Sequence, residues 1–306
     1  MRALDMRAKI PAAVAAVALL VAGLLFYVMR GGSGYEPYTG PPASPGTPAA
    51  EPARTLNIAL NTEPSDYPRL RELGYDLVDV KPDAASVDGV PDGMRAMLWV
   101  GNFTCGDFEL SYEALTEAVR RLARHPKVYG WYLSDEPNPR ECPRIAGEIR
   151  RRADLIEREA PGQISFISLT DWPMKPVTPD KVNVDLVGLD PYPCKGSARV
   201  RSRCDIGAID RMIRMADDAG IPRRVVVPVF QTFGQGCSKG DRQYWLPTET
   251  QLRQILHRWD RLVPRPPMDI AYSWGHQEQW ACPTLADASG GSHPDLQSIM
   301  KARNTR

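Results

Sequence analysis

The chain has 306 residues, of which 25% are charged, and its formal net charge is only +1. This is the composition of an ordinary globular protein, far from the weakly hydrophobic and highly charged composition of disordered chains. The near-zero net charge also argues against nucleic acid as the main partner, because neutralising phosphates requires a clustered basic surface.

The N-terminal segment combines positive charge with a long apolar run at 10–29. The basic residues that precede this run are Arg2, Arg7 and Lys9. About 20 residues in a helix span roughly 30 Å, which is enough to cross a bilayer. The charges place the N-terminus inside the cell and the rest of the chain outside. We therefore predict a cytoplasmic tip and transmembrane signal-anchor at 1–30. The alternative is a signal peptide that is cleaved to release a secreted protein, but the apolar run is longer than such peptides usually have.

The segment that follows, 31–53, is dense in Pro, Gly, Ser and Ala. It shows no apolar periodicity, so we expect a flexible, semi-extended linker between the membrane and the rest of the chain. The remaining residues, 54–306, have about the length of one (β/α)8 barrel.

From residue 54 onward, short β-branched or apolar runs alternate with segments of helical spacing. This alternation favours parallel strands joined by crossover helices. Eight runs are predicted strands: Leu56–Leu60, Leu77–Val80, Ala96–Val100, Val128–Leu133, Ile164–Leu169, Leu186–Leu189, Val225–Phe230 and Ile270–Trp274. We therefore predict an α/β fold, a (β/α)8 TIM barrel. A doubly wound open sheet is the alternative, but no Gly-rich phosphate loop follows the first strand.

Four of the connections have amphipathic helical spacing. They are Tyr112–Ala123, Ile145–Glu159, Ile206–Asp218 and Thr248–Val263. The second connection, 82–93, is too short and too rich in Pro and Gly to predict a regular helix.

Six cysteines follow predicted strands, in the loops of what would be the C-terminal face of the barrel. Their even number and the predicted outside location favour disulfides, and the partners lie in neighbouring loops or, for Cys194 and Cys204, in one loop. The predicted bridges are Cys105–Cys142, Cys194–Cys204 and Cys237–Cys282. No CxxC or HxH spacing occurs, so neither a metal site nor a cofactor is predicted.

Acidic residues stand at the ends of two predicted strands, where barrel enzymes carry their chemistry. The run VYGWYLSDEP leads the fourth strand directly into Asp135 and Glu136. Because side chains alternate along a strand, one of these acids can face the barrel mouth while the other is held in the wall. The sixth strand adds Asp190 and Tyr192 in the run GLDPYP.

The last two strands add an amide and several aromatic or ionisable residues. The seventh ends at Gln231, and the eighth runs into Trp274, His276 and Glu278. Carboxylates among Trp and Tyr residues suit a carbohydrate-binding cleft. The acids accept hydroxyl hydrogen bonds or transfer protons, while aromatic faces pack on the C–H faces of pyranose rings. We therefore interpret these residues, together with Tyr192, as substrate-binding candidates.

These strand ends resemble the glycoside-hydrolase-type (β/α)8 barrels of the clan that carries its acid/base on strand four and its nucleophile on strand seven. WYLSDEP is similar to the Asn-Glu-Pro ending of strand four in that clan, so the resemblance implies that Glu136 is the acid/base. It also implies that Tyr192 corresponds to the strand-six Tyr that contacts the nucleophile. Trp274 would correspond to the strand-eight Trp that forms the floor of the sugar site.

Two residues depart from that pattern. Asp135 replaces the usual Asn, and Gln231 stands where the nucleophilic Glu is expected. An amide cannot form the covalent glycosyl-enzyme intermediate, although Asp190 or Glu278 could supply a second carboxylate, with inversion and a wider separation. Asp135 could instead satisfy backbone donors, Asp190 could be a turn residue before a proline, and Glu278 could lie in a solvated loop.

The resulting prediction is a membrane-anchored, extracytoplasmic barrel that hydrolyses O-glycosidic bonds of a cell-envelope or environmental polysaccharide. Glu136 is its predicted general acid/base, and Asp190 and Asp135 are the further catalytic candidates. The alternative is a catalytically inactive carbohydrate-binding or cell-envelope scaffold barrel, for which Gln231 is the main argument.

Overall fold

The computed structural model describes residues 54–196, 203–237, 243–277, 280–287 and 291–306. The predicted anchor and linker at 1–53 lie outside these residues, as does Glu278. Among the residues it describes, no helix is both long enough and apolar enough to span a membrane.

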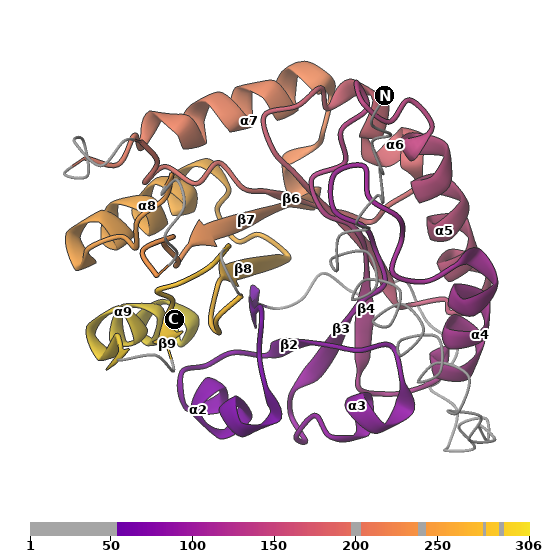
Figure 1. Ribbon diagram of the computed structural model, residues 1–306, viewed down its shortest axis with the longest axis horizontal. Helices are drawn as coiled ribbons and strands as arrows, with labels where there is room; N and C mark the ends of the chain where they lie inside the picture. Colours follow the sequence, from indigo (N-terminus) through magenta and orange to yellow (C-terminus); the bar gives the residue numbers. More distant parts are fainter. Residues whose placement is uncertain (1–53, 197–202, 238–242, 278–279, 288–290) are drawn as a thin grey trace, which may run out of the picture. The chain divides into compact units, whose positions relative to one another are not determined.

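Eight parallel strands close into a barrel, each pairing with the next and β1 pairing with β8 (Figure 1). They are β1 (Leu56–Ala59), β2 (Leu77–Val80), β3 (Arg95–Trp99), β4 (Val128–Ser134), β5 (Ile164–Leu169), β6 (Leu186–Leu189), β7 (Val226–Gln231) and β8 (Met268–Tyr272). A two-stranded pair, β9 (Ala286–Asp287) and β10 (Gly291–Ser292), lies outside the barrel. The (β/α)8 prediction is confirmed, and the open-sheet alternative is wrong.

Helices join the strands and surround them on the outside (Figure 1). Among the described residues they are α2 (Tyr67–Glu72), α3 (Ala84–Asp88), α4 (Tyr112–Leu122), α5 (Ile145–Glu159), α6 (Pro179–Val182), α7 (Gly207–Ala219), α8 (Glu249–Leu262) and α9 (Pro294–Asn304). The four predicted helices correspond to α4, α5, α7 and α8.

The connection at 82–93, for which no regular helix was predicted, holds the five-residue α3. Asp83 caps this helix, because its side chain accepts a hydrogen bond from Ser86 N at 2.9 Å. A local cap of this kind supports a single turn even where Pro and Gly exclude a longer helix.

Side chains on the strands alternate between two apolar layers, as a period of two requires. Met97, Phe166 and Val229 belong to the cluster that fills the barrel. Trp131 and Phe230 belong to the layer packed between strands and helices. Because both faces of every strand are buried, a register slip would exchange the two layers, and the positions of the strand ends are thereby fixed.

Three disulfides fasten loops on the C-terminal face, and all three predicted pairs are confirmed. The bridges are Cys105–Cys142, Cys194–Cys204 and Cys237–Cys282, with Cα–Cα distances of 5.7, 4.2 and 5.4 Å. The first ties the β3–α4 loop to the β4–α5 loop, and the last ties the β7–α8 loop to the β8–α9 loop. Two pairs of neighbouring loops at the barrel mouth are therefore cross-linked, and Cys194–Cys204 closes the β6–α7 loop on itself.

Candidate active site

Three carboxyl groups gather where β4 and β6 end. Asp135 and Glu136 follow β4 directly, and Asp190 follows β6 directly. β5 separates the two strands in the barrel order, so the acids come from strand ends two positions apart. The backbone beyond β4 continues to pair on both sides: Asp135 N donates to Asn102 O at 2.7 Å, and Glu136 N donates to Ser168 O at 3.2 Å.

Asp135 is held in the wall of the site by two hydroxyl groups. Its Oδ1 accepts hydrogen bonds from Tyr132 Oη at 2.7 Å and from Ser168 Oγ at 2.5 Å. Burial raises the pKa of Asp135, and these two hydroxyl donors oppose that shift because they favour the charged form. Asp135 therefore matches the structural interpretation of the sequence in part, although its donors are side chains rather than backbone groups.

Glu136 and Asp190 form a hydrogen-bonded pair of acids. Asp190 is 3% exposed, and its carboxyl group contacts that of Glu136. Two ionised carboxylates cannot hydrogen bond to each other, so the pair must hold a proton. Asp190 Oδ1 is buried and accepts no hydrogen bond from the described donors.

The surroundings raise the pKa of both acids. Burial, followed by the charge of Asp135, raises the pKa of Glu136 to about 7, while the hydrogen bond from Asp190 and the charge of Lys195 act in the opposite direction. Burial and the neighbouring charges of Glu136 and Asp135 also raise the pKa of Asp190 well above its ordinary value. Because Asp190 is the hydrogen-bond donor of the pair, it keeps its proton while Glu136 changes between its acid and base forms near neutral pH.

The backbone is strained at two residues of this site. Glu136 has φ +47° and Tyr192 has φ +37°, a region that residues other than glycine rarely adopt. Such conformations persist where the surrounding structure enforces them, and they are concentrated at functional sites. Here the strain falls on the residue with the titrating carboxyl group and on an aromatic residue that donates to Asp190 at 3.5 Å.

An aromatic wall stands beside the acid pair. Tyr192 contacts the rings of Phe233, Tyr244 and Tyr272, with centroid distances of 5.0, 5.8 and 5.8 Å. Across the barrel mouth, Trp99 packs edge-on against Tyr132 at 4.9 Å. The structure thus brings Tyr192 together with the acids as predicted, and the additional aromatic residues come from β3, β4, β8 and the β7–α8 loop.

Trp274 does not line this site, and its predicted role as the floor of a sugar site is wrong. It is 1% exposed and packs edge-on against Tyr75, with a centroid distance of 6.2 Å, in the layer between barrel and helices. β8 ends at Tyr272, two residues before the predicted end, and Tyr272 belongs to the cluster inside the barrel. Tyr272 is therefore the β8 aromatic residue at the mouth.

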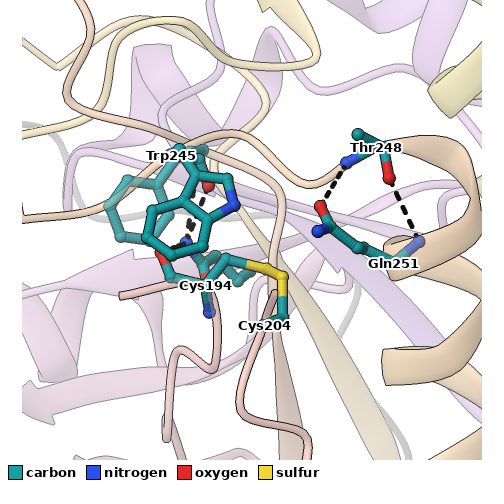
Figure 2. The surroundings of a disulfide bond; sticks show 7 residues. Cys194, Cys204, Trp245, Thr248 and Gln251 are labelled. Atoms are coloured by element: carbon teal, nitrogen blue, oxygen red, sulfur yellow. Dashed lines mark hydrogen bonds between the residues drawn. A yellow bond between two sulfur atoms is a disulfide. The ribbon is translucent and has the colours of Figure 1, made fainter. Parts of the chain in front are cut away.

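Gln231 also does not line the cleft, so its predicted role in substrate binding is wrong. Its side chain is fully buried (0% exposed) and hydrogen bonds to backbone groups of two loops. Oε1 accepts from Cys194 N at 2.7 Å, and Nε2 donates to Cys194 O at 3.2 Å and to Trp245 O at 3.1 Å. Figure 2 shows Trp245 beside the Cys194–Cys204 disulfide that Gln231 holds in place. The amide is a clamp between the β6–α7 and β7–α8 loops.

The remaining predicted residues lie in the β8–α9 loop. His276 is exposed there, and Glu278 lies outside the described residues. Their neighbour Gln277 connects the loop to the site, because its Oε1 accepts a hydrogen bond from Tyr272 Oη. A surface hollow of about 500 Å³ between the β7–α8 loop and the start of α9 shares Tyr244 with the aromatic wall but is not lined by Asp135, Glu136 or Asp190.

Sequence reasoning missed several residues that define the site. Tyr132 and Ser168 hold Asp135, while Asp171 and Lys195 act on the charge of Glu136. Their signal was present but weak, because each falls on or just after a predicted strand. To select the site residues among the polar residues at strand ends, one must know which side chains point toward the same part of the barrel mouth.

No protein-family model matches the chain, and no curated protein is similar to it in sequence. Solved structures do match. A β-galactosidase from the psychrophilic Marinomonas ef1 superposes with TM-score 0.60 at 9% identity, covering 82% of this chain and 59% of that one. The β-glucuronidase 2 of Bacteroides uniformis has TM-score 0.53 at 14% identity, covering 74% of this chain but only 31% of that one.

The GH18 chitinase ChiB of Flavobacterium johnsoniae has TM-score 0.51 at 9% identity, covering 82% of this chain and 94% of that one. At this level of identity, the comparisons establish that the chain has the (β/α)8 barrel fold that these glycoside hydrolases share. The chain spans about a third of the length of the glucuronidase and nearly all of the chitinase.

The role of Gln231 as a clamp predicts the effect of replacing it by an acid. In Gln231→Glu, an ionised carboxylate would face the carbonyl oxygens of Cys194 and Trp245 in a buried position, which should destabilise the fold by about 3–5 kcal/mol. Urea unfolding at pH 8 measures this loss, and it should shrink at acidic pH as the new carboxyl group protonates. Gln254→Glu, on an exposed face of α8, is the matched control. A fully stable Gln231→Glu variant would contradict the clamp.

The raised pKa of Glu136 predicts that the site itself destabilises the folded protein above neutral pH. An acid whose pKa rises from about 4.5 to about 7 on folding binds more protons in the folded state, so stability falls as pH rises through that interval. Glu136→Gln removes this effect. The variant should be more stable than wild type by about 2–4 kcal/mol at pH 8, and this difference should be smaller at pH 4.

Urea unfolding across pH 4–8 tests this prediction, with Glu117→Gln on the exposed face of α4 as the control. Equal stability of wild type and Glu136→Gln at pH 8 would show that Glu136 titrates as an ordinary surface acid.

Proposed function

We propose that this protein hydrolyses O-glycosidic bonds and that Glu136 is its general acid/base. The observation that carries the proposal is the position of Glu136, in contact with Asp190 and next to Asp135, because burial and the charge of Asp135 raise the pKa of Glu136 to about 7. A group that is to donate a proton to a leaving oxygen, and to take one back, works best with a pKa near the working pH. The surrounding tyrosines, and the barrel fold shared with known glycosidases, support carbohydrate as the substrate class.

Asp190 has a different role from that of a second catalytic carboxylate. The two carboxyl groups that flank a scissile glycosidic bond stand about 5–5.5 Å apart in retaining enzymes and about 6.5–9.5 Å apart in inverting ones. Glu136 and Asp190 are in hydrogen-bond contact, which leaves no room for a sugar between them. We propose that Asp190 tunes and orients Glu136, and that Asp135 adds a fixed negative charge.

The carboxylate that acts on the attacking water must therefore be a residue other than Asp190. Asp171, exposed just after β5, is the further acid whose charge acts on Glu136. We propose that it activates or orients the attacking water at a wider separation, which corresponds to the inverting arrangement. Gln231 cannot do so from its buried position.

A non-catalytic carbohydrate-binding barrel is the second candidate function. The specific observation in its favour is Gln231, a neutral clamp at the end of the strand where the resembling clan carries its nucleophile. A binding protein would also use the tyrosine wall. Binding alone does not require an acid with a pKa near 7, so the Glu136–Asp190 pair favours the hydrolase.

We also propose that the domain is held outside the cell by the apolar run at 10–29, with a polysaccharide of the cell envelope or the environment as substrate. The three disulfides support this location, since such bonds persist in oxidising compartments.

The location predicts that the full chain is recovered with the membrane fraction of its host. Protease added to intact cells, after removal of any outer barrier, should digest it, because residues 54–306 would face outward. Recovery of a soluble form that begins within 31–53 would show a cleaved signal peptide instead.

The proposed chemistry predicts a large effect of Glu136→Gln on turnover. On any nitrophenyl glycoside or oligosaccharide that the wild type cleaves, the rate should fall about 10²–10⁴-fold, the usual size of a lost proton transfer. The rate of the wild type should decline above about pH 7, where Glu136 loses its proton. In Asp190→Leu this decline should move to higher pH, because the hydrogen bond that favours ionised Glu136 is gone.

Glu117→Gln is again the matched control. Wild-type turnover that Glu136→Gln leaves unchanged would refute the assignment. Carbohydrate binding by a wild type that cleaves nothing would support the binding-protein alternative.

A further inference from the structure

Two large apolar side chains are left exposed among the residues that the structure describes, and they lie next to each other. Phe103 is 51% exposed and Trp280 is 49% exposed. Their ring centroids are 6.2 Å apart, and the planes are inclined at 51°. Single exposed apolar residues are common on protein surfaces. Two aromatic rings from distant parts of the sequence that meet in solvent form a small apolar platform, which requires an explanation.

Phe103 lies on the backbone that borders the acids. It forms a parallel bridge with Asp135, and Thr104 N donates to Asp135 O at 2.8 Å. Gly101 allows this close approach, because a Cβ there would lie 2.6 Å from the backbone of Leu133. The β3–α4 loop thus runs directly beside the end of β4, one residue before Glu136.

Trp280 is connected to the aromatic wall of the site. Its backbone N donates to Gln277 O at 2.8 Å, and the Gln277 side chain accepts a hydrogen bond from Tyr272. Trp280 therefore lies on the β8–α9 loop and is linked through Gln277 to Tyr272, the β8 residue at the barrel mouth.

Disulfides hold both loops in place. Phe103 precedes Cys105 by two residues, and Trp280 precedes Cys282 by two residues; each of these cysteines is bridged to a neighbouring loop. In the barrel order, β1 and β2 separate β8 from β3, so the two loops meet over that side of the mouth. The disulfides thus fix both loops, and with them the two rings, before a ligand binds, which lowers the entropic cost of binding.

We propose that Phe103 and Trp280 form a distal sugar subsite, so that the protein acts on an oligosaccharide chain that extends beyond the unit at the acid pair. This inference rests on the proposed function and specifies its substrate as a chain rather than a single sugar unit. Planar rings suit the C–H faces of a pyranose, and their loops continue directly into the carboxylates and tyrosines of the site. Exposed rings contribute little to folding, so ligand binding is the role that accounts for them.

The test compares chain lengths in the full-length protein. Cello-, chito- and xylo-oligosaccharides of one to six units are titrated into wild type, Phe103→Ala, Trp280→Ala and the double variant by calorimetry. For the series that binds, each single variant should weaken binding of the longer oligosaccharides about tenfold, which corresponds to about 1.4 kcal/mol. Binding of the one-unit sugar should not change. Phe103→Tyr and Trp280→Phe should retain long-chain binding, whereas Phe103→Leu should lose it.

Several results would overturn the proposal. They are an unchanged ratio of long-chain to one-unit affinity in the double variant, full binding in Phe103→Leu, or no binding of any series by wild type. Self-association of wild type that the double variant abolishes, with oligosaccharide affinity unchanged, would identify a contact surface between copies instead. Failure of the proposed hydrolysis is a separate result, because Glu136→Gln reports on turnover while these variants report on chain-length dependence of binding.

Discussion

Two carboxyl groups that touch in a buried site must share a proton, and the chemistry of this barrel depends on that constraint. Asp190 keeps its proton because it is the more deeply buried of the two acids and faces the charges of Glu136 and Asp135. Glu136 is left to titrate near neutral pH. Burial and the charge of Asp135 raise the pKa of Glu136, while the hydrogen bond from Asp190 opposes this shift, and the result makes Glu136 a candidate for proton transfer in both directions.

The surrounding structure holds these two acids in contact. Both faces of the strands are buried, so the register of the barrel fixes where β4 and β6 end. Tyr132 and Ser168 hold the third acid, Asp135, in the wall. Gln231 fastens the loop after β6 to the loop after β7. Two disulfides join neighbouring loops around the mouth, and Cys194–Cys204 closes the loop after β6 on itself. Rigid support of this kind is what a strained, like-charged site requires.

The barrel and the disulfides could be predicted from the sequence because both follow from local patterns: β-branched runs in regular alternation, and cysteines just after them. Asp135, Glu136, Asp190 and Tyr192 could be predicted to gather because parallel strand ends meet on one face. The wrong predictions concern residues whose side-chain orientation depends on the residue at which a strand ends or on which loops lie side by side. Trp274 was expected at the mouth, but β8 ends at Tyr272, which turns Trp274 into the layer under the helices. Gln231 has the position of a catalytic residue, yet its amide satisfies the backbone of two loops that the sequence does not show to be adjacent.

The central claim is that Glu136 exchanges its proton near neutral pH, because burial and the charge of Asp135 raise its pKa while Asp190 stays protonated beside it. Carbon NMR of the full chain labelled at the glutamate carboxyl groups, with the Glu136 signal assigned by its loss in Glu136→Gln, measures this pKa directly. We expect a midpoint near pH 7 in wild type. A midpoint in the ordinary range of surface glutamates, about 4–4.5, would contradict the raised pKa of Glu136 and with it the assignment of Glu136 as the acid/base.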